Sequence, residues 1–68
     1  MEMASSMIDS ADYDAAAQTL IITFKKRGAV FEYANVPEHI YSGLSSAESA
    51  GKFFHSHIKG KYVTNKIN

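Results

Sequence analysis

Residues 19–34 form two runs of alternating side chains that a short charged link separates, and this pattern constrains the fold most strongly. Residues 19–25 are Thr-Leu-Ile-Ile-Thr-Phe-Lys, and residues 29–34 are Ala-Val-Phe-Glu-Tyr-Ala. Runs of β-branched and aromatic residues with a period of two are typical of strands. The link ends at Gly28, which readily adopts a positive φ, so the sequence predicts an antiparallel hairpin.

This hairpin needs a further element, because two strands alone are marginally stable in water. Residues 5–13 contain Ile8 and Tyr13 and predict an earlier strand, with residues 14–18 as the turn. Ala15 to Ala17 also suit a helical extension, so that alternative stays open. The face of the hairpin that we expect in the core consists of Leu20, Ile22, Phe24, Phe31 and Tyr33.

The spacing of apolar residues becomes helical after Val36. Pro37 suits the first position of a helix, and Glu38 suits the positive end of the helix dipole. Gly43 weakens this helix by up to about 1 kcal/mol, so we expect it to be short. Its apolar stripe consists of Ile40, Tyr41 and Leu44.

A second short helix is predicted to begin between Ser46 and Ser49, with either serine as its N-cap. Gly60 is a natural stop for this helix. Its apolar side consists of Phe53, Phe54, His57 and Ile58.

These elements predict an α+β fold in which a three-stranded antiparallel meander precedes two short helices packed on one face. The 68 residues fit one domain, which we expect over residues 5–65, with flexible ends at residues 1–4 and 66–68. Tyr62, Val63 and Ile67 suit a short packing tail. The side chains expected to be buried together are Phe24, Tyr33, Leu44, Phe54 and Ile58.

Several classes of protein are excluded by composition. Hydrophobic residues make up 46% and charged residues 21% of the chain, which is ordinary for a globular domain. The absence of cysteine excludes disulfides, thiolate metal sites and cysteine nucleophiles, and it fits a reducing compartment. Residues 1–7 lack a basic start followed by an apolar run, so we expect no signal peptide. No apolar run approaches the roughly 20 residues of a membrane helix. We therefore expect a cytoplasmic protein that contacts no membrane.

The formal net charge of zero results from four blocks of alternating sign. Residues 1–24 carry −4, residues 25–27 carry +3, residues 28–48 carry −3 and residues 49–68 carry +4. Such asymmetry is compatible with a basic face on a neutral protein. It also fits lysines that collect at solvated turns and at the C-terminal end of a helix.

Candidate catalytic and metal-binding groups do not assemble into a site. His55 and His57 point about 200° apart on a helix, so they do not chelate one ion. Asp12 and Asp14 fit a turn better than a carboxylate pair. We therefore expect no catalytic residue, no metal and no cofactor.

A weak phosphate site is conceivable at Ser49, Gly51 and Lys52, where helix N–H groups and a lysine converge. The competing interpretation is a capping serine with a solvated lysine. Phe31 and Tyr33 have the character of base-stacking residues, but a domain this small needs its aromatic side chains for the core.

The order of these features resembles the KTSC domain, named after the C-terminus of certain lysyl-tRNA synthetases. The residues that carry the resemblance are Ser6-x-Ile8, Tyr13-Asp14, Leu20-x-Ile22-x-Phe24, Gly28, Phe31-Glu32-Tyr33, Val36-Pro37, Tyr41, Leu44, Ser49-Ala50-Gly51-Lys52-Phe53-Phe54, Ile58 and Tyr62.

The resemblance implies a domain that occurs fused to synthetases and as free single-domain proteins of bacteria and phages; this chain looks like the free form. RNA binding is implied by the synthetase context, and no activity is assigned. The family has a central Tyr-x-Tyr, whereas this chain has Phe31 first, so a hydroxyl there is dispensable and an acid–base role is disfavoured.

Two functions remain as hypotheses. The first is a non-enzymatic module that binds RNA, such as tRNA, through a basic helix end. The second is a protein-interaction module, such as a small phage-type regulator that docks on a host enzyme. The residues predicted to contact nucleic acid are Lys25, Lys26, Arg27, Lys52, Lys59 and Lys61.

Overall fold

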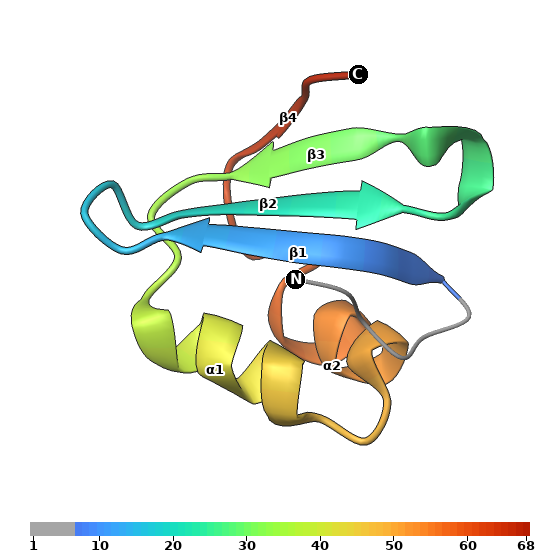
Figure 1. The fold of residues 1–68 in the computed structure, drawn as a ribbon. Helices are drawn as coiled ribbons and strands as arrows, with labels where there is room; N and C mark the ends of the chain where they lie inside the picture. Colours follow the sequence, from blue (N-terminus) through green and yellow to red (C-terminus); the bar gives the residue numbers. More distant parts are fainter. Residues whose placement is uncertain (1–6) are drawn as a thin grey trace.

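The computed structural model describes residues 7–68, and they form one four-stranded sheet with two α-helices on one side (Figure 1). The predicted strand residues 5 and 6, and the predicted flexible end at residues 1–4, lie outside the described residues. The elements are β1 (Ile8–Asp14), β2 (Thr19–Phe24), the 3₁₀ turn η1 (Lys26–Gly28), β3 (Val30–Tyr33), α1 (Glu38–Ser46), α2 (Ala50–His57) and β4 (Thr64–Lys66).

The sheet has the order β1-β2-β3-β4, and every neighbouring pair is antiparallel. The α+β class and the hairpin are therefore confirmed, but the number of strands is four rather than the predicted three. Both helices lie between β3 and β4 in the chain, and β4 returns to pair with β3 (Figure 1). Val30 also bonds to Ile67 and Asn68, so pairing extends into the end predicted as flexible.

A bulge in β1 explains why its sequence pattern is weak. Ile8 pairs with Phe24 and Ser10 with Thr23, so Asp9 is an extra residue in the ladder. Because an extra residue shifts the alternation, Ile8 and Ala11 both lie in the core although they are three positions apart. A strict period of two therefore misses Ala11.

The link between β2 and β3 is closed by backbone hydrogen bonding. The N–H of Phe24 donates to the carbonyl of Ala29 at 2.8 Å, and η1 occupies the space between them. Gly28 has φ +60°, as the hairpin prediction requires. Arg27 shares this left-handed conformation at φ +65°, which places a charged side chain at the tip of the turn.

The helices begin and end close to the predicted positions. Pro37 is the N-cap of α1 rather than its first residue, and Ser49 is the N-cap of α2. The hydroxyl of Ser49 accepts from the N–H of Lys52 at 3.3 Å, which confirms the capping interpretation. The chain leaves α2 through Gly60 at φ +75°. No helix among residues 7–68 is long and apolar enough to cross a membrane.

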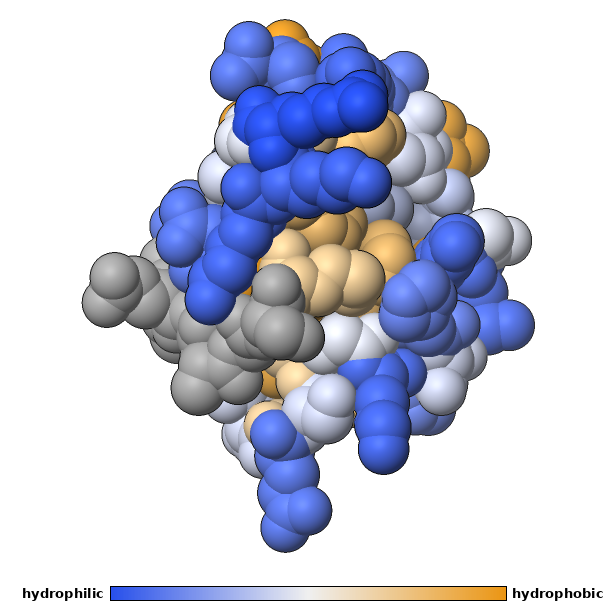
Figure 2. Space-filling view, turned by 90° about the vertical axis from the view of Figure 1, so that its right-hand side faces the viewer, coloured by the Kyte–Doolittle hydropathy of each residue, from blue (hydrophilic) through white to orange (hydrophobic). Residues whose placement is uncertain are grey.

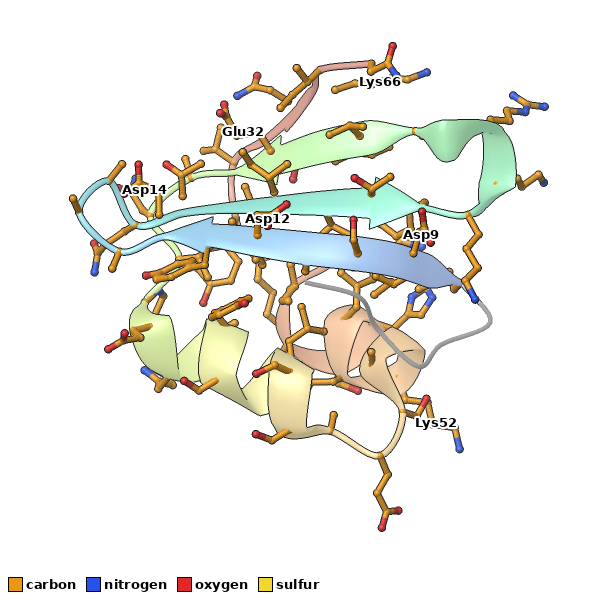
Figure 3. The ribbon with its side chains drawn as sticks, viewed as in Figure 1. Asp9, Asp12, Asp14, Glu32, Lys52 and Lys66 are labelled. Atoms are coloured by element: carbon orange, nitrogen blue, oxygen red, sulfur yellow. The ribbon has the colours of Figure 1, made fainter. Side chains whose placement is uncertain are left out.

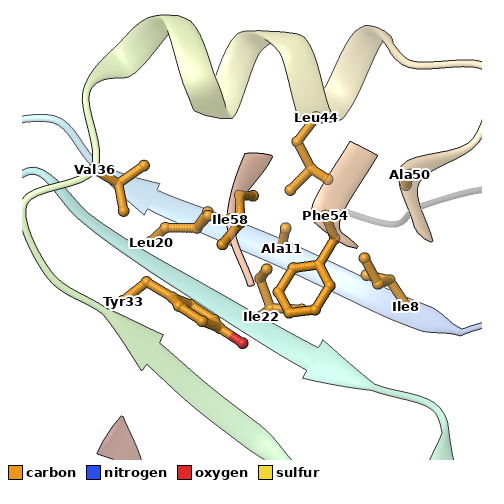
Figure 4. Packing of buried hydrophobic residues seen from close by; sticks show 10 residues of the cluster. All are labelled: Ile8, Ala11, Leu20, Ile22, Tyr33, Val36, Leu44, Ala50, Phe54 and Ile58. Carbon is orange, nitrogen blue, oxygen red and sulfur yellow. The ribbon is translucent and has the colours of Figure 1, made fainter. Parts of the chain in front are cut away.

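The core lies between the sheet and the helices (Figure 4). Tyr33, Leu44, Phe54 and Ile58 are buried, as predicted. Phe24, the fifth residue expected there, is only half-buried, because β2 ends at this residue, and Phe31 is half-buried as well. The ten buried residues are Ile8, Ala11, Leu20, Ile22, Tyr33, Val36, Leu44, Ala50, Phe54 and Ile58.

Phe54 is expected to be essential for stability. Its ring contacts those of Phe24 and Tyr33 edge-on, at centroid distances of 5.4 and 5.7 Å. Truncation by Phe54→Ala should cost about 3–5 kcal/mol and leave so small a domain largely unfolded. Val63→Ala, at a side chain that is 66% exposed, should change stability by no more than about 0.5 kcal/mol. Urea denaturation measures both effects, and a stably folded Phe54→Ala protein contradicts this assignment of the core.

Gly43 permits the close approach of α1 and α2. A Cβ on Gly43 would lie 2.5 Å from Cζ of Phe53. Alanine normally stabilises a helix interior relative to glycine, but here we expect Gly43→Ala to destabilise the domain by about 1–3 kcal/mol because the ring must move. Combining it with Phe53→Leu should relieve the clash and give a coupling energy of about 0.5–3 kcal/mol in a double-mutant cycle. Strictly additive effects would show that the two positions do not meet.

Tyr33 makes stability sensitive to alkaline pH. Burial raises the pKa of its phenol from 10.0 to about 12. Between these values the folded protein keeps a proton that the unfolded chain has released, so the free energy of unfolding falls as pH rises. We expect this group to account for a loss of about 1–3 kcal/mol from pH 10 to 12. Denaturation across this range should show a smaller loss for Tyr33→Phe, and equal losses would refute the assignment.

Candidate nucleic-acid interface

A hollow of about 470 Å³ opens at the end of the molecule where β1 begins and β2 turns into β3. Its volume lies within the range of small-ligand pockets, roughly 300–1,000 Å³. Figure 2 shows this side of the molecule, with an apolar patch at its centre and hydrophilic side chains above it and to its right. The residues that line the hollow are Met7, Phe24, Lys26, Phe31, Phe54, His55 and Lys59.

Three phenylalanine rings form the wall of this hollow. Phe24 at the end of β2 meets Phe31 on β3 at a centroid distance of 5.6 Å and an interplanar angle of 81°. Phe24 also meets Phe54 of α2 at 5.4 Å and 73°. Such edge-to-face contacts are favourable and hold the rings in place. The aromatic wall therefore joins β2 and β3 to α2.

Two lysines from distant parts of the chain lie on the rim. Lys26 comes from the turn between β2 and β3, whereas Lys59 follows α2. The N–H of Lys59 donates to the carbonyl of Phe54 at 2.9 Å, which fixes the backbone of Lys59 beside the aromatic wall. No Asp or Glu is among the described residues that line the hollow, whereas Lys26 and Lys59 are.

The structure brings together some of the predicted basic residues. Lys26 and Lys59 line the hollow, whereas Lys25, Arg27, Lys52 and Lys61 are exposed and do not line it. Lys52 and His55 lie one turn apart on α2, whereas Lys59 lies in the turn that follows this helix. One residue of the basic turn, Lys26, and one residue after α2, Lys59, therefore line the same opening.

A second, smaller hollow of about 230 Å³ adjoins the first. The two share Phe24, Phe31, Phe54 and Lys59 as lining residues. The second extends to Thr64 on β4, and together they form a trough along the inner side of β3. We call the two hollows together the aromatic trough.

Acidic side chains occupy the opposite face of the sheet. The pairing of Asp12 with Ile21, and of Ile21 with Glu32, places these three residues in one row across β1, β2 and β3. This row points away from the core, because Leu20 and Ile22 beside it are buried. Figure 3 shows Asp12 and Glu32 above the sheet and Lys52 on the helix side. The neutral net charge therefore hides an acidic face and a basic rim.

The other candidate groups have structural roles. Asp14 accepts from the N–H groups of Ala16 and Ala17 at 3.1 and 3.3 Å, so it stabilises the turn after β1 as predicted. Asp12, which was also predicted to lie in a turn, instead lies within β1 and pairs with Ile21. Tyr33 is only 3% exposed and belongs to the core. Within residues 7–68 no three His, Asp or Glu side chains gather as a metal site would require. At the predicted phosphate site, the hydroxyl of Ser49 already accepts from the N–H of Lys52.

Tyr13 also acts structurally. Its hydroxyl donates to the carbonyl of Val36, and its ring stacks on Tyr41 at a centroid distance of 5.1 Å. Desolvation raises the pKa of the Tyr13 phenol, and the carboxylates of Glu38 and Asp14 add to this effect. The phenol therefore stays neutral at physiological pH and serves as a donor that ties β1 to the chain before α1.

The half-exposed state of Phe24 and Phe31 was missed by the sequence analysis, which placed both rings in the core. The only signal for Phe24 is its position directly before Lys25 and Lys26, where a strand gives way to a charged turn. For Phe31 the sequence holds no such signal, because its neighbours alternate as in any half-buried strand. Met7, which also lines the hollow, was not singled out.

Comparisons of sequence and of structure with known proteins identify the same family. The family model for the KTSC domain matches residues 4–62. A crystal structure of a KTSC domain protein from Yersinia pestis has a TM-score of 0.95 and 38% identity, and the match covers 100% of this chain and 94% of that one.

Two sequence relatives are similarly close. A lysine–tRNA ligase of Trichormus variabilis is 40% identical over 63 residues, which is 93% of this chain but only 11% of the ligase. A protein of Tsukamurella paurometabola is 38% identical over 58 residues, which is 85% of both chains. The matched unit is therefore a small part of one relative and most of the other.

Proposed function

The chain belongs to the KTSC domain family, and we propose that it is a non-enzymatic RNA-binding module that uses the basic rim of the aromatic trough. The observation that carries the proposal is the meeting of Lys26 and Lys59, from separate segments, at one apolar opening that no described acidic residue lines. Ammonium groups at such an opening are placed to contact phosphates, and phosphate contacts dominate the affinity of proteins for nucleic acid.

The relative from Trichormus variabilis supports RNA as the partner. That protein is named a lysine–tRNA ligase, and the matching segment covers 93% of this chain. A domain of this kind within a protein named for tRNA is consistent with a tRNA-related role. The activity of the ligase itself is not carried over, because this chain spans only 11% of its length.

The distribution of charge favours one face of the domain for the proposed binding. Phosphates are attracted to the rim with Lys26 and Lys59 and repelled by the face with Asp12 and Glu32. Lys25, Arg27, Lys52 and Lys61 add to the attraction from outside the trough. Because only a few cations take part and the net charge is zero, we expect modest affinity that falls as the salt concentration rises. The proposed module binds its partner without transforming it.

A protein partner is the second candidate, and one observation favours it. Val63 and Ile67 beside β4 are 66% and 54% exposed, and β4 is the edge strand next to β3. Exposed apolar side chains along a sheet edge are typical of surfaces to which another chain adds a strand. A small regulator that docks on a host enzyme is a function of this kind.

Removal of Lys59 should weaken RNA binding and its salt dependence. We expect Lys59→Ala to lower the slope of log affinity against log salt concentration by about 1, and Lys26→Ala/Lys59→Ala by about 2. Fluorescence anisotropy with labelled tRNA at several salt concentrations measures both slopes.

The matched control is Lys66→Ala, which removes the same charge from β4, where the side chain does not line the trough. Figure 3 shows Lys66 at the edge of the sheet. This variant should change binding less than Lys59→Ala. If the wild type does not bind at low salt, or if the two variants have equal effects, the RNA-binding proposal is wrong. Binding of a protein partner then becomes the better-supported function.

A further inference from the structure

The walls of the aromatic trough offer more than phosphate contacts. Phe24 and Phe31 are half-buried, so part of each ring faces the opening, although a small domain ordinarily uses its aromatic residues for the core. The rings stand at 81° to each other. A flat ligand that stacks on one ring is therefore met by the edge of the other, and both arrangements are favourable for aromatic groups.

We propose that the aromatic trough binds an unpaired nucleobase of an RNA strand, with the adjoining phosphates on Lys26 and Lys59. This inference rests on the proposed RNA-binding function and adds the part of the RNA that is recognised. Aromatic side chains stack on bases that are free of a duplex, because paired bases are covered by their neighbours. The domain therefore selects single-stranded segments, such as loops and ends.

The charges on the rim identify the occupant as a nucleotide rather than as an apolar side chain of a protein. An apolar side chain fills the space between the rings but offers nothing to the two flanking ammonium groups. A nucleotide supplies both a flat apolar surface and an anionic backbone, and it matches phenyl walls beside Lys26 and Lys59. None of the described residues that line the trough is an Asp or Glu, so those residues do not repel the phosphates.

The first test uses the wild-type protein and three RNA probes of equal length: a uridine decamer, its abasic analogue and a duplex. All three carry phosphates, but only the decamer presents unpaired bases. We expect the decamer to bind about 5- to 150-fold more tightly than the abasic strand, as stacking of one base predicts, and the duplex to bind as weakly as the abasic strand. Equal affinity for all three probes overturns the base site and leaves phosphate binding intact.

The second test changes Phe31, which lies on β3 at the mouth of the trough. Phe31→Leu keeps an apolar side chain but removes the stacking surface, whereas Phe31→Tyr keeps the ring. We expect Phe31→Leu to lose the preference for the decamer over the abasic strand, with an unchanged salt slope, and Phe31→Tyr to retain the preference. Thermal melting verifies that both variants are folded. If one variant does not fold, the comparison of the three probes on the wild-type protein still tests the proposal.

The outcomes separate the two proposals. If the wild type binds no probe at low salt, the RNA-binding function fails together with the base site. If it binds them but Phe31→Leu keeps the full preference for the decamer, the base lies elsewhere and only this inference is overturned. If uridine monophosphate alone binds as tightly as the decamer, the trough is a site for a free nucleotide and its assignment to an RNA strand is wrong.

Discussion

The edge-to-face packing of Phe54 against Phe24 and Tyr33 is the contact on which the rest of the structure depends. It fastens α2 to two different strands, because Phe24 ends β2 and Tyr33 ends β3. The same ring forms one wall of the aromatic trough, and its backbone carbonyl fixes the position of Lys59. Stability and the proposed binding surface therefore share one side chain, which limits how freely the trough can be altered.

Elements with a strong local signal were predictable from the sequence. The hairpin follows from alternating residues and Gly28, and α2 follows from the N-cap at Ser49. β4 was missed because Thr64, Asn65 and Lys66 are polar and exposed, so neither alternation nor burial marks them. Its strand character comes from backbone pairing with β3, which is a tertiary effect.

The sequence predicted which cationic residues belong to the candidate site, but it did not predict where on the surface they lie. Lys26 and Lys59 stand out in the charge pattern, yet their meeting at one opening depends on how α2 packs against the end of the hairpin. The half-exposure of Phe31 likewise follows from where the helices stop covering the sheet. Composition reports a net charge of zero, and only the register of the strands reveals that Asp12 and Glu32 share the opposite face.

The two helices that separate β3 from β4 in the chain affect how fast these two strands pair during folding. The pairings of β1 with β2 and of β2 with β3 close through short turns, whereas that of β3 with β4 encloses both helices. Closing a long loop is slow, and a three-residue strand without buried side chains contributes little to hold it. We expect such an edge strand to fray locally while the hairpins stay intact. Since Thr64 lines the second hollow, release of β4 from β3 would remove part of the wall of the aromatic trough.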